Sequence, residues 1–336
     1  MRPPKLLGLC VVAAIFAAPA VAQPRKAPEK PLHIAFLAAG SQNGFNQSVW
    51  AGIQSAARKA GNVNVRLFDG GFDSTQQYNQ LEDVVASHAY DGVILFPNDS
   101  VSIASAVSHA AARGINTVAV EFPIGPKLDQ LEPQVPGIVA TVAAKPSAGA
   151  RLQAEAVGRY CRSRPVCNVV ILIGLKVYPF DQLRYQTYME TLKHYPNVRV
   201  RATIEGNYDA ATSMNGMLDV LQIDRHVDAV LSPADIQTIG AEMALKNFGI
   251  DPRSLYLAGG GGSQIAVTAL RQGRWSSTYG AMTATMGVAA LDAIVGSLRG
   301  RKGPTVIDAD TLSPFPPIWT QDIMRAHPDF VAQWAG

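Results

Sequence analysis

The fold is decided by residues 32–60, LHIAFLAAGSQNGFNQSVWAGIQSAARKA, in which an apolar run leads through a polar loop into an amphipathic segment. Residues 32–38 predict a buried parallel strand, because a short apolar run without in/out alternation ends at a turn signal. Apolar residues then recur at helical spacing, with Val49 and Ile53 on one face, and predict a helix. The loop at 41–46 follows the carboxyl end of this strand. Open α/β sheets bind ligands at that edge, so this loop is the first candidate site.

The same order of strand, loop and helix recurs with a period of roughly 30 residues. Such alternation predicts parallel strands, right-handed crossovers and helices on both faces of each sheet. A break at 122–137 with four prolines separates two series, and about 310 residues after signal removal favour two doubly wound α/β lobes over one core. The strands expected are 32–38, 63–68, 92–96 and 117–120 in the first series, and 138–142, 169–173, 198–204, 229–231, 255–258 and 278–282 in the second.

The first 22 residues have the features of a cleaved secretory signal. Arg2 and Lys5 precede an apolar run at 6–18, and Ala20-Val21-Ala22 has the small-x-small pattern of a signal peptidase site. The apolar run is shorter than the about 20 residues that span a bilayer, and no later stretch is both long and apolar enough. The sequence therefore predicts a protein that is secreted and soluble after cleavage.

Charge and cysteine content narrow the function class. Loss of residues 1–22 leaves 27 Lys and Arg against 26 Asp and Glu, a net charge of +1, which is not the footprint of a nucleic-acid-binding protein. Cys161 and Cys167 remain, with no His or third Cys near them. In an oxidising compartment this pair predicts a small disulfide loop rather than a metal site, with two free thiols as the alternative.

Enzyme motifs are absent from the sequence: there is no H-E-x-x-H, G-x-S-x-G or C-x-x-C, and the six His are scattered. We therefore expect no enzyme, no cofactor and no metal. The glycine run at 259–262 offers a rival interpretation, since glycines between a strand and a helix can admit a phosphate. Position 264 is Gln and no acid follows to hold a ribose. A pocket wall free of side chains is the favoured interpretation.

The two-lobed, exported plan resembles the type I periplasmic binding proteins, most closely the ribose/galactose-type sugar-binding subfamily that serves ABC transporters. The resemblance is carried by the order and spacing of the loops QNGF at 42–45 and PNDS at 97–100 and of the segments DAVLSPADIQTIGA and YLAGGGG. It covers roughly residues 32–300.

That resemblance implies a clamshell that closes on its ligand by hinge motion. Three chain crossings are expected, near 122–126, 282–285 and 301–304. The N-terminal lobe would hold 32–121 plus 285–301, and the C-terminal lobe 126–282 plus 304–336, with a proline-rich aromatic tail packed across a surface.

The same resemblance implies a function and partners. The protein would act as a monomer without a cofactor, and it would deliver a small-molecule ligand to the permease of an ABC transporter. The alternative is a sensor that presents its closed form to a chemoreceptor or a membrane histidine kinase, since both use the same clamshell.

In the first lobe, the resemblance implies that Asn43 and Phe45 grip and stack a sugar ring and that Asp99 accepts hydrogen bonds from hydroxyl groups. Phe45 could instead be a hydrophobic staple of its helix, and Asp99 or Asn98 a helix N-cap. The first-lobe candidates are Gln42, Asn43, Phe45, Asn46, Asn98, Asp99, Glu121 and Phe122.

The second lobe departs from the resembled pattern. The expected Arg is displaced to Arg184, the expected Asn is Ala234, the expected Asp falls in the glycine run, and the late Gln becomes Ala281 or Met282. With three hydroxyl-reading groups missing, we expect a ligand that is polar at one end and flatter or more apolar at the other. It could be a deoxy or modified sugar, a polyol derivative, or a small aromatic or terpenoid compound. The second-lobe candidates are Tyr178, Phe180, Asp181, Arg184, Asp235, Gly261 and Met282.

Overall fold

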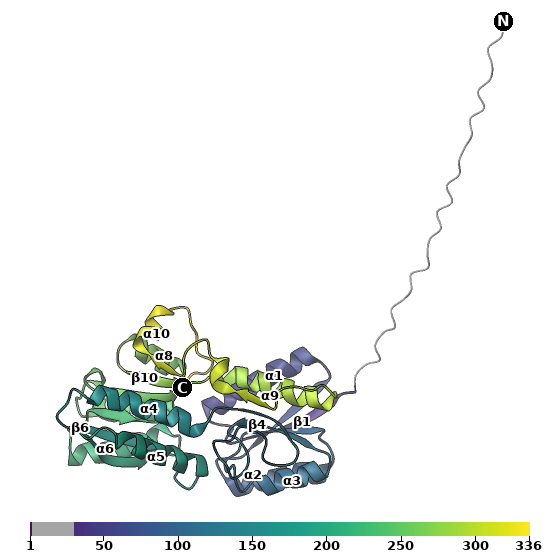
Figure 1. Cartoon of the computed structure of the whole chain (residues 1–336), viewed down its shortest axis with the longest axis horizontal. Coiled ribbons are helices and arrows are strands. Elements are labelled where there is room, and N and C mark those ends of the chain that lie inside the picture. The colour runs from purple at the N-terminus through teal and green to yellow at the C-terminus, as the bar shows by residue number, and fades with distance from the viewer. Residues whose placement is uncertain (2–29) are drawn as a thin grey trace. The chain divides into compact units, whose positions relative to one another are not determined.

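Strand and helix alternate from residue 32 onward, as predicted, and build two parallel-type sheets (Figure 1). The computed structural model describes Met1 and residues 30–336, and residues 31–336 form one unit. The predicted signal peptide lies outside the described residues.

The first sheet is six-stranded within the described residues, with the order β11-β5-β4-β3-β1-β2 and parallel pairing throughout. In β1, Ile34 and Phe36 face α1 and α9, whereas Ala35 and Leu37 face α2 and α3. Both faces of the strand are covered, which explains its unbroken apolar run. We call this sheet with its helices the first lobe. Its elements are β1 (Leu32–Ala38), α1 (Gly44–Ala60), β2 (Val63–Asp69), α2 (Ser74–Ser87), β3 (Gly92–Leu95), α3 (Ala104–Ala112), β4 (Asn116–Glu121), β5 (Ile138–Ala143), α9 (Thr283–Leu298) and β11 (Val306–Asp308).

The second sheet has the order β12-β10-β9-β8-β6-β7 within the same residues, and only the edge strand β12 is antiparallel to its neighbour. Helices α4 and α5 cover one face, and α6, α7 and α8 cover the other. We call this sheet with its helices the second lobe. Its elements are α4 (Pro146–Cys161), β6 (Cys167–Ile173), α5 (Pro179–Leu192), β7 (Val198–Glu205), α6 (Ala210–Ile223), β8 (Ala229–Leu231), α7 (Asp235–Asn247), η1 (Pro252–Ser254), β9 (Tyr256–Gly261), α8 (Gln264–Arg271), β10 (Ser277–Gly280), β12 (Ile318–Thr320) and α10 (Gln321–Ala326); the short helix η2 (Ala309–Leu312) follows β11.

Two of the expected crossings between the lobes are wrong. Strand β5 pairs in parallel with β4, so the chain leaves the first lobe after residue 143 rather than at 122–126. Strand β11 pairs with β5, so the last passage follows residue 308 rather than 301–304. The physical reason is that the proline-rich break marks where one element ends but carries no information about which sheet the next strand joins. The middle passage joins β10 of the second sheet to α9, which packs on the first sheet.

The predicted disulfide between Cys161 and Cys167 is present, with a Cα–Cα distance of 5.5 Å. Both residues are fully buried between α4 and the sheet, and the bridge closes the turn from α4 into β6.

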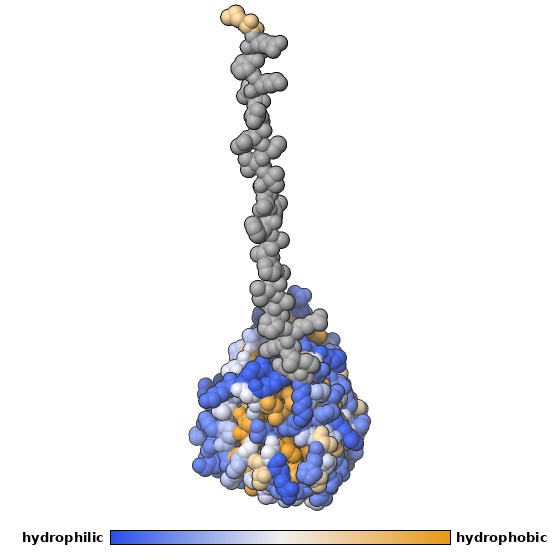
Figure 2. All heavy atoms as spheres, turned by 90° about the vertical axis from the view of Figure 1, so that its right-hand side faces the viewer, coloured by the Kyte–Doolittle hydropathy of each residue, from blue (hydrophilic) through white to orange (hydrophobic). Residues whose placement is uncertain are grey.

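The face of the first lobe drawn in Figure 2 is mostly hydrophilic, with a few apolar residues grouped among charged and polar ones. Among the described residues, no helix combines the length and apolar character needed to cross a bilayer.

Candidate ligand-binding site

A cavity of about 100 Å³ lies where the carboxyl ends of the two sheets meet. The loops after β1, β3 and β4 line it from the first lobe, and the ends of β8, β9 and β10 line it from the second. This is the edge at which parallel sheets offer backbone and side chains to a ligand. The predicted residues that line it are Asn43, Phe45, Asn46, Asn98, Glu121, Phe122, Phe180, Arg184 and Gly261.

Three asparagines shape the first-lobe wall. The Asn43 side chain caps α1, accepting from the backbone N–H groups of Phe45 at 3.0 Å and Asn46 at 3.3 Å. Asn46 and Asn98 both bind the backbone of Ala39, through its N–H and its C=O respectively. These amides therefore hold the loops after β1 and β3 together, and the capped turn places the Phe45 ring at the cavity.

Aromatic rings run across the cavity from one lobe to the other. Phe45 meets Phe96 edge-on at 6.1 Å, and Phe96 meets Phe122 in the same way at 6.1 Å. Phe122 then stacks on Phe180 of the second lobe, with centroids 4.0 Å apart. The wall is therefore largely apolar and suited to a flat or weakly polar ligand face.

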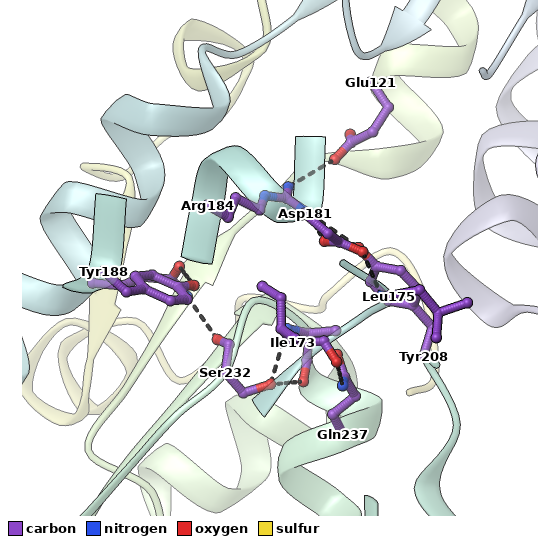
Figure 3. A network of polar contacts seen from close by, with 11 residues as sticks. Glu121, Ile173, Leu175, Asp181, Arg184, Tyr188, Tyr208, Ser232 and Gln237 are labelled. Atoms are coloured by element: carbon purple, nitrogen blue, oxygen red, sulfur yellow. Dashed lines mark hydrogen bonds and ion pairs between the residues drawn. The ribbon is translucent and has the colours of Figure 1, made fainter. Parts of the chain in front are cut away.

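One charged side chain of the second lobe reaches the first (Figure 3). Arg184 approaches Glu121 at 3.9 Å and Asp181 at 3.7 Å, and it donates to the Tyr208 hydroxyl at 3.3 Å. Its guanidinium also lies 5.0 Å from the centroid of the Phe122 ring. The side chain is 15% exposed, so the pair with Glu121 is only partly screened by water.

Glu121 ends β4 in a backbone conformation that is unusual for a residue with a side chain, with φ at 71°. Burial raises its pKa to about 7; the Arg184 charge opposes this and Asp310 adds to it. An acid in this strained backbone conformation, buried beside an arginine at a cavity, is a candidate functional group.

The lobes are also in direct contact through Tyr178 and Phe72. The Tyr178 hydroxyl donates to the backbone C=O of Phe72, and the Phe72 ring stacks on Tyr208 at 6.0 Å. Tyr178 thus joins the lobes and does not line the cavity, contrary to our expectation for it. The reason is that its hydroxyl is bound to Phe72 and its ring stacks on Phe180, which lines the cavity itself.

Two first-lobe candidates do not line the cavity either. Asp99 accepts from the N–H groups of Val101 at 2.8 Å and Ser102 at 3.0 Å, so it caps the turn before α3. Gln42 is exposed and donates to the hydroxyl of Ser41. For Asp99, the capping alternative is therefore the one that the structure supports.

Two second-lobe acids are fully buried, and their carboxylates are hydrogen-bonded within the lobe. Asp181 accepts from the Leu175 N–H at 2.9 Å and the Tyr208 hydroxyl at 2.6 Å, and burial raises its pKa to about 6 although the Arg184 charge favours ionisation. Asp235 accepts from the Ser263 N–H and the Thr278 hydroxyl, both at 2.7 Å. These carboxylates tie loops to strands and leave the cavity wall to other residues. Met282 also lies outside that wall, at the N-cap of α9.

Gly260 and Gly261 of the glycine run form part of the cavity wall, but the run does not form a phosphate site. Residues 259–261 belong to β9, and a Cβ on Gly261 would stand 2.6 Å from the Trp334 ring. The first N–H groups of α8, those of Gln264 and Ile265, donate to the C=O groups of Trp334 and Ala335. The groups that would cradle a phosphate are therefore occupied by the chain itself. Within residues 30–336, no cluster of three His, Cys, Asp or Glu side chains is placed to hold a metal.

Several lining residues were not predicted. A repeated signal could have found two of them: GGFD at 70–73 and GNYD at 206–209 each follow a strand and end in an Asp that caps the next helix. Phe72 and Tyr208 occupy the same place in this repeat, and both have positive φ. The later segments carried no comparable signal. The unpredicted lining residues include Phe72, Phe96, Gln153, Tyr208, Tyr279, Asp310 and Trp334.

Comparison with known proteins identifies the family of the chain. A family model for the periplasmic binding protein domain matches residues 34–302. The chain belongs to this family. This periplasmic binding protein is 24% identical over 268 residues to the ribose import binding protein of Bacillus subtilis (strain 168). The aligned residues make up 80% of the chain and 82% of that protein.

Solved structures show the same fold. An ABC transporter solute-binding protein from Agrobacterium vitis with bound D-fucose matches with a TM-score of 0.77 and 18% identity, over 88% of this chain and 98% of that one. A protein from Mycobacterium smegmatis in complex with β-D-fucofuranose matches with a TM-score of 0.77 and 17% identity, over 89% of this chain and 94% of that one. The predicted type I periplasmic binding protein fold with two doubly wound lobes is confirmed. The matched proteins are binding proteins rather than enzymes, as expected.

Proposed function

We propose that this periplasmic binding protein captures a small sugar-like ligand and delivers it to the permease of an ABC transporter by closing its lobes. The observation that carries the proposal is the Glu121–Arg184 pair at the lobe boundary, set in a cavity whose walls are mostly aromatic. One end of such a cavity offers charge to hydroxyl groups, and the rest offers apolar surface.

The charged pair suits a sugar hydroxyl group. Glu121 can accept a hydrogen bond while Arg184 donates one, and at 3.9 Å the two groups are far enough apart for a hydroxyl to bind both. Hydrogen bonds to charged groups contribute about 1.5–3 kcal/mol each. Hydroxyl groups placed against Phe45 or Phe122 would instead lose their hydration without a partner. We therefore propose a deoxy or otherwise partly apolar sugar, a class that includes the fucose forms bound in the two solved structures.

A binding screen tests this part of the proposal. Calorimetry on the mature protein with matched pairs, D-fucose against D-galactose and 6-deoxy-D-glucose against D-glucose, should show tighter binding of the deoxy member. Ribose and glucose should bind at least ~100-fold more weakly than the best ligand, because the second lobe lacks several polar contacts. Tight binding of unmodified ribose or glucose would contradict the proposal.

Transport and signalling can be separated in cells. Deletion of the protein should abolish uptake of the radiolabelled ligand, whereas retained uptake with lost chemotaxis or lost transcriptional response would favour the sensor. The proposal also requires export: periplasmic protein should begin at Gln23, which intact mass spectrometry measures. Material that retains residue 1 would contradict the cleaved signal.

A further inference from the structure

The C-terminal tail was expected to pack across a surface, but one of its last residues, Trp334, lines the cavity. Trp334 is buried, with 6% of its surface exposed, and it is one of the lining residues. Its ring meets Phe45 edge-on at 5.8 Å, and its indole N–H donates to the C=O of Gly261 at 2.7 Å. One ring therefore contacts the ligand loop of the first lobe and the end of β9 in the second.

The tail is anchored to both lobes at adjacent residues. On the first-lobe side, the C=O of Gln333 accepts from the Ser48 hydroxyl at 2.9 Å, and its side-chain amide bonds to the backbone and hydroxyl of Thr285. On the second-lobe side, the C=O of Trp334 accepts from the first N–H of α8 at 2.9 Å. These contacts fix the position of the indole, so the ring is a built part of the wall and not a loose end.

The backbone beside the ring is adapted to it. Gly261 has φ at 111°, a conformation that strains other residues, and an added Cβ would stand 2.6 Å from the indole. At Gly44, an added Cβ would stand 3.2 Å from the same ring. Two glycines, one from each lobe, thus leave the space that the indole fills.

We propose that Trp334 is part of the ligand site and that its ring selects a ligand face without hydroxyl groups. This rests on the proposed function, because it assigns selectivity within the same cavity. The indole face offers carbon–hydrogen groups a stacking surface, and its only polar hydrogen is already bound to Gly261. A hydroxyl facing the ring would therefore be desolvated without a partner.

The test uses the mature full-length chain and the two sugar pairs, D-fucose with D-galactose and 6-deoxy-D-glucose with D-glucose. Trp334→Leu keeps an apolar side chain but removes the aromatic face. It should weaken binding of the preferred deoxy sugar by about 10-fold or more and reduce the preference over the hydroxylated partner. The control is Trp50→Phe, because Trp50 stacks on Phe36 outside the cavity.

Tryptophan emission gives a second readout. The preferred sugar should change the emission of the wild-type protein and of Trp50→Phe, and this change should vanish in Trp334→Phe, a variant that keeps a ring to support the fold. Wild-type affinity and preference in Trp334→Leu, or an unchanged emission response in Trp334→Phe, would overturn the assignment while leaving the proposed function intact. A wild-type protein that binds none of the four sugars would contradict the proposed function, and the role of Trp334 would fall with it.

Discussion

Phe45 and Asp99 follow neighbouring strands of the first sheet, yet they have different surroundings. Phe45 lines the cavity between Phe96 and Trp334, whereas Asp99 caps a turn. Phe45→Ala should therefore weaken ligand binding by about 10-fold or more. Asp99→Ala should leave affinity within about 2-fold and lower the free energy of unfolding by about 1 kcal/mol, as loss of a cap does.

Calorimetry and urea unfolding on the two variants give both quantities. The opposite pattern, with affinity lost in Asp99→Ala and kept in Phe45→Ala, would place the site away from the cavity described here.

Glu121 should make stability depend on pH. Its pKa is raised from 4.5 to about 7 in the folded protein, so between these values the folded chain holds a proton that the unfolded chain releases. Stability therefore falls as pH rises through this window. Glu121→Gln should reduce that fall in stability. Part of the fall should remain in the variant, because the pKa values of Asp181 and Asp235 are also raised, each to about 6.

Urea unfolding at pH 5, 6, 7 and 8 measures the profile. Glu155→Gln is the matched control, since Glu155 forms an exposed i,i+4 pair with Arg159; it should follow the wild type. A Glu121→Gln profile parallel to that of the wild type would argue against the raised pKa.

At the scale of elements, the turn from α4 into β6 is closed by Cys161 and Cys167. A disulfide that closes a loop this short restricts the unfolded chain and contributes roughly 2–3 kcal/mol. The double variant Cys161→Ala/Cys167→Ala should lose about that much stability and keep its ligand affinity, because neither residue lines the cavity. Thermal unfolding with and without reductant checks this: reductant should destabilise the wild type alone. A wild type that is insensitive to reductant after full reduction would contradict the contribution.

For the whole molecule, the proposed closure of the lobes would depend on contacts that cross between them. The hydrogen bond from Tyr178 to the C=O of Phe72 is one of them. Tyr178→Phe should shift the ligand-free protein towards open forms and weaken binding by about 5-fold, the equivalent of one hydrogen bond. Small-angle scattering should show a larger radius of gyration for this variant without ligand, and a decrease on ligand addition for both proteins.

Tyr90→Phe is the control for that experiment, since Tyr90 packs on Phe68 within the first lobe. An unchanged radius of gyration in the wild type at saturating ligand would exclude the clamshell mechanism.

The sequence by itself determined the local structure and much of the plan. The first strand has the predicted bounds, and the strand at 229–231 does too, because short apolar runs between turn signals depend on nearby residues alone. Two lobes, the disulfide and a cavity at the carboxyl edge of the first sheet also followed from spacing, length and resemblance.

Only the tertiary structure decided which strands share a sheet and which polar groups remain free to line the cavity. β5 and β11 join the first sheet through pairing with distant strands, which periodicity does not encode. The carboxylates of Asp181 and Asp235 accept hydrogen bonds from segments remote in sequence and do not line the cavity. Trp334 reaches the cavity from the far end of the chain. The physical reason is common to all: local patterns report burial and turns, whereas partners at long sequence separation are chosen by the packed fold.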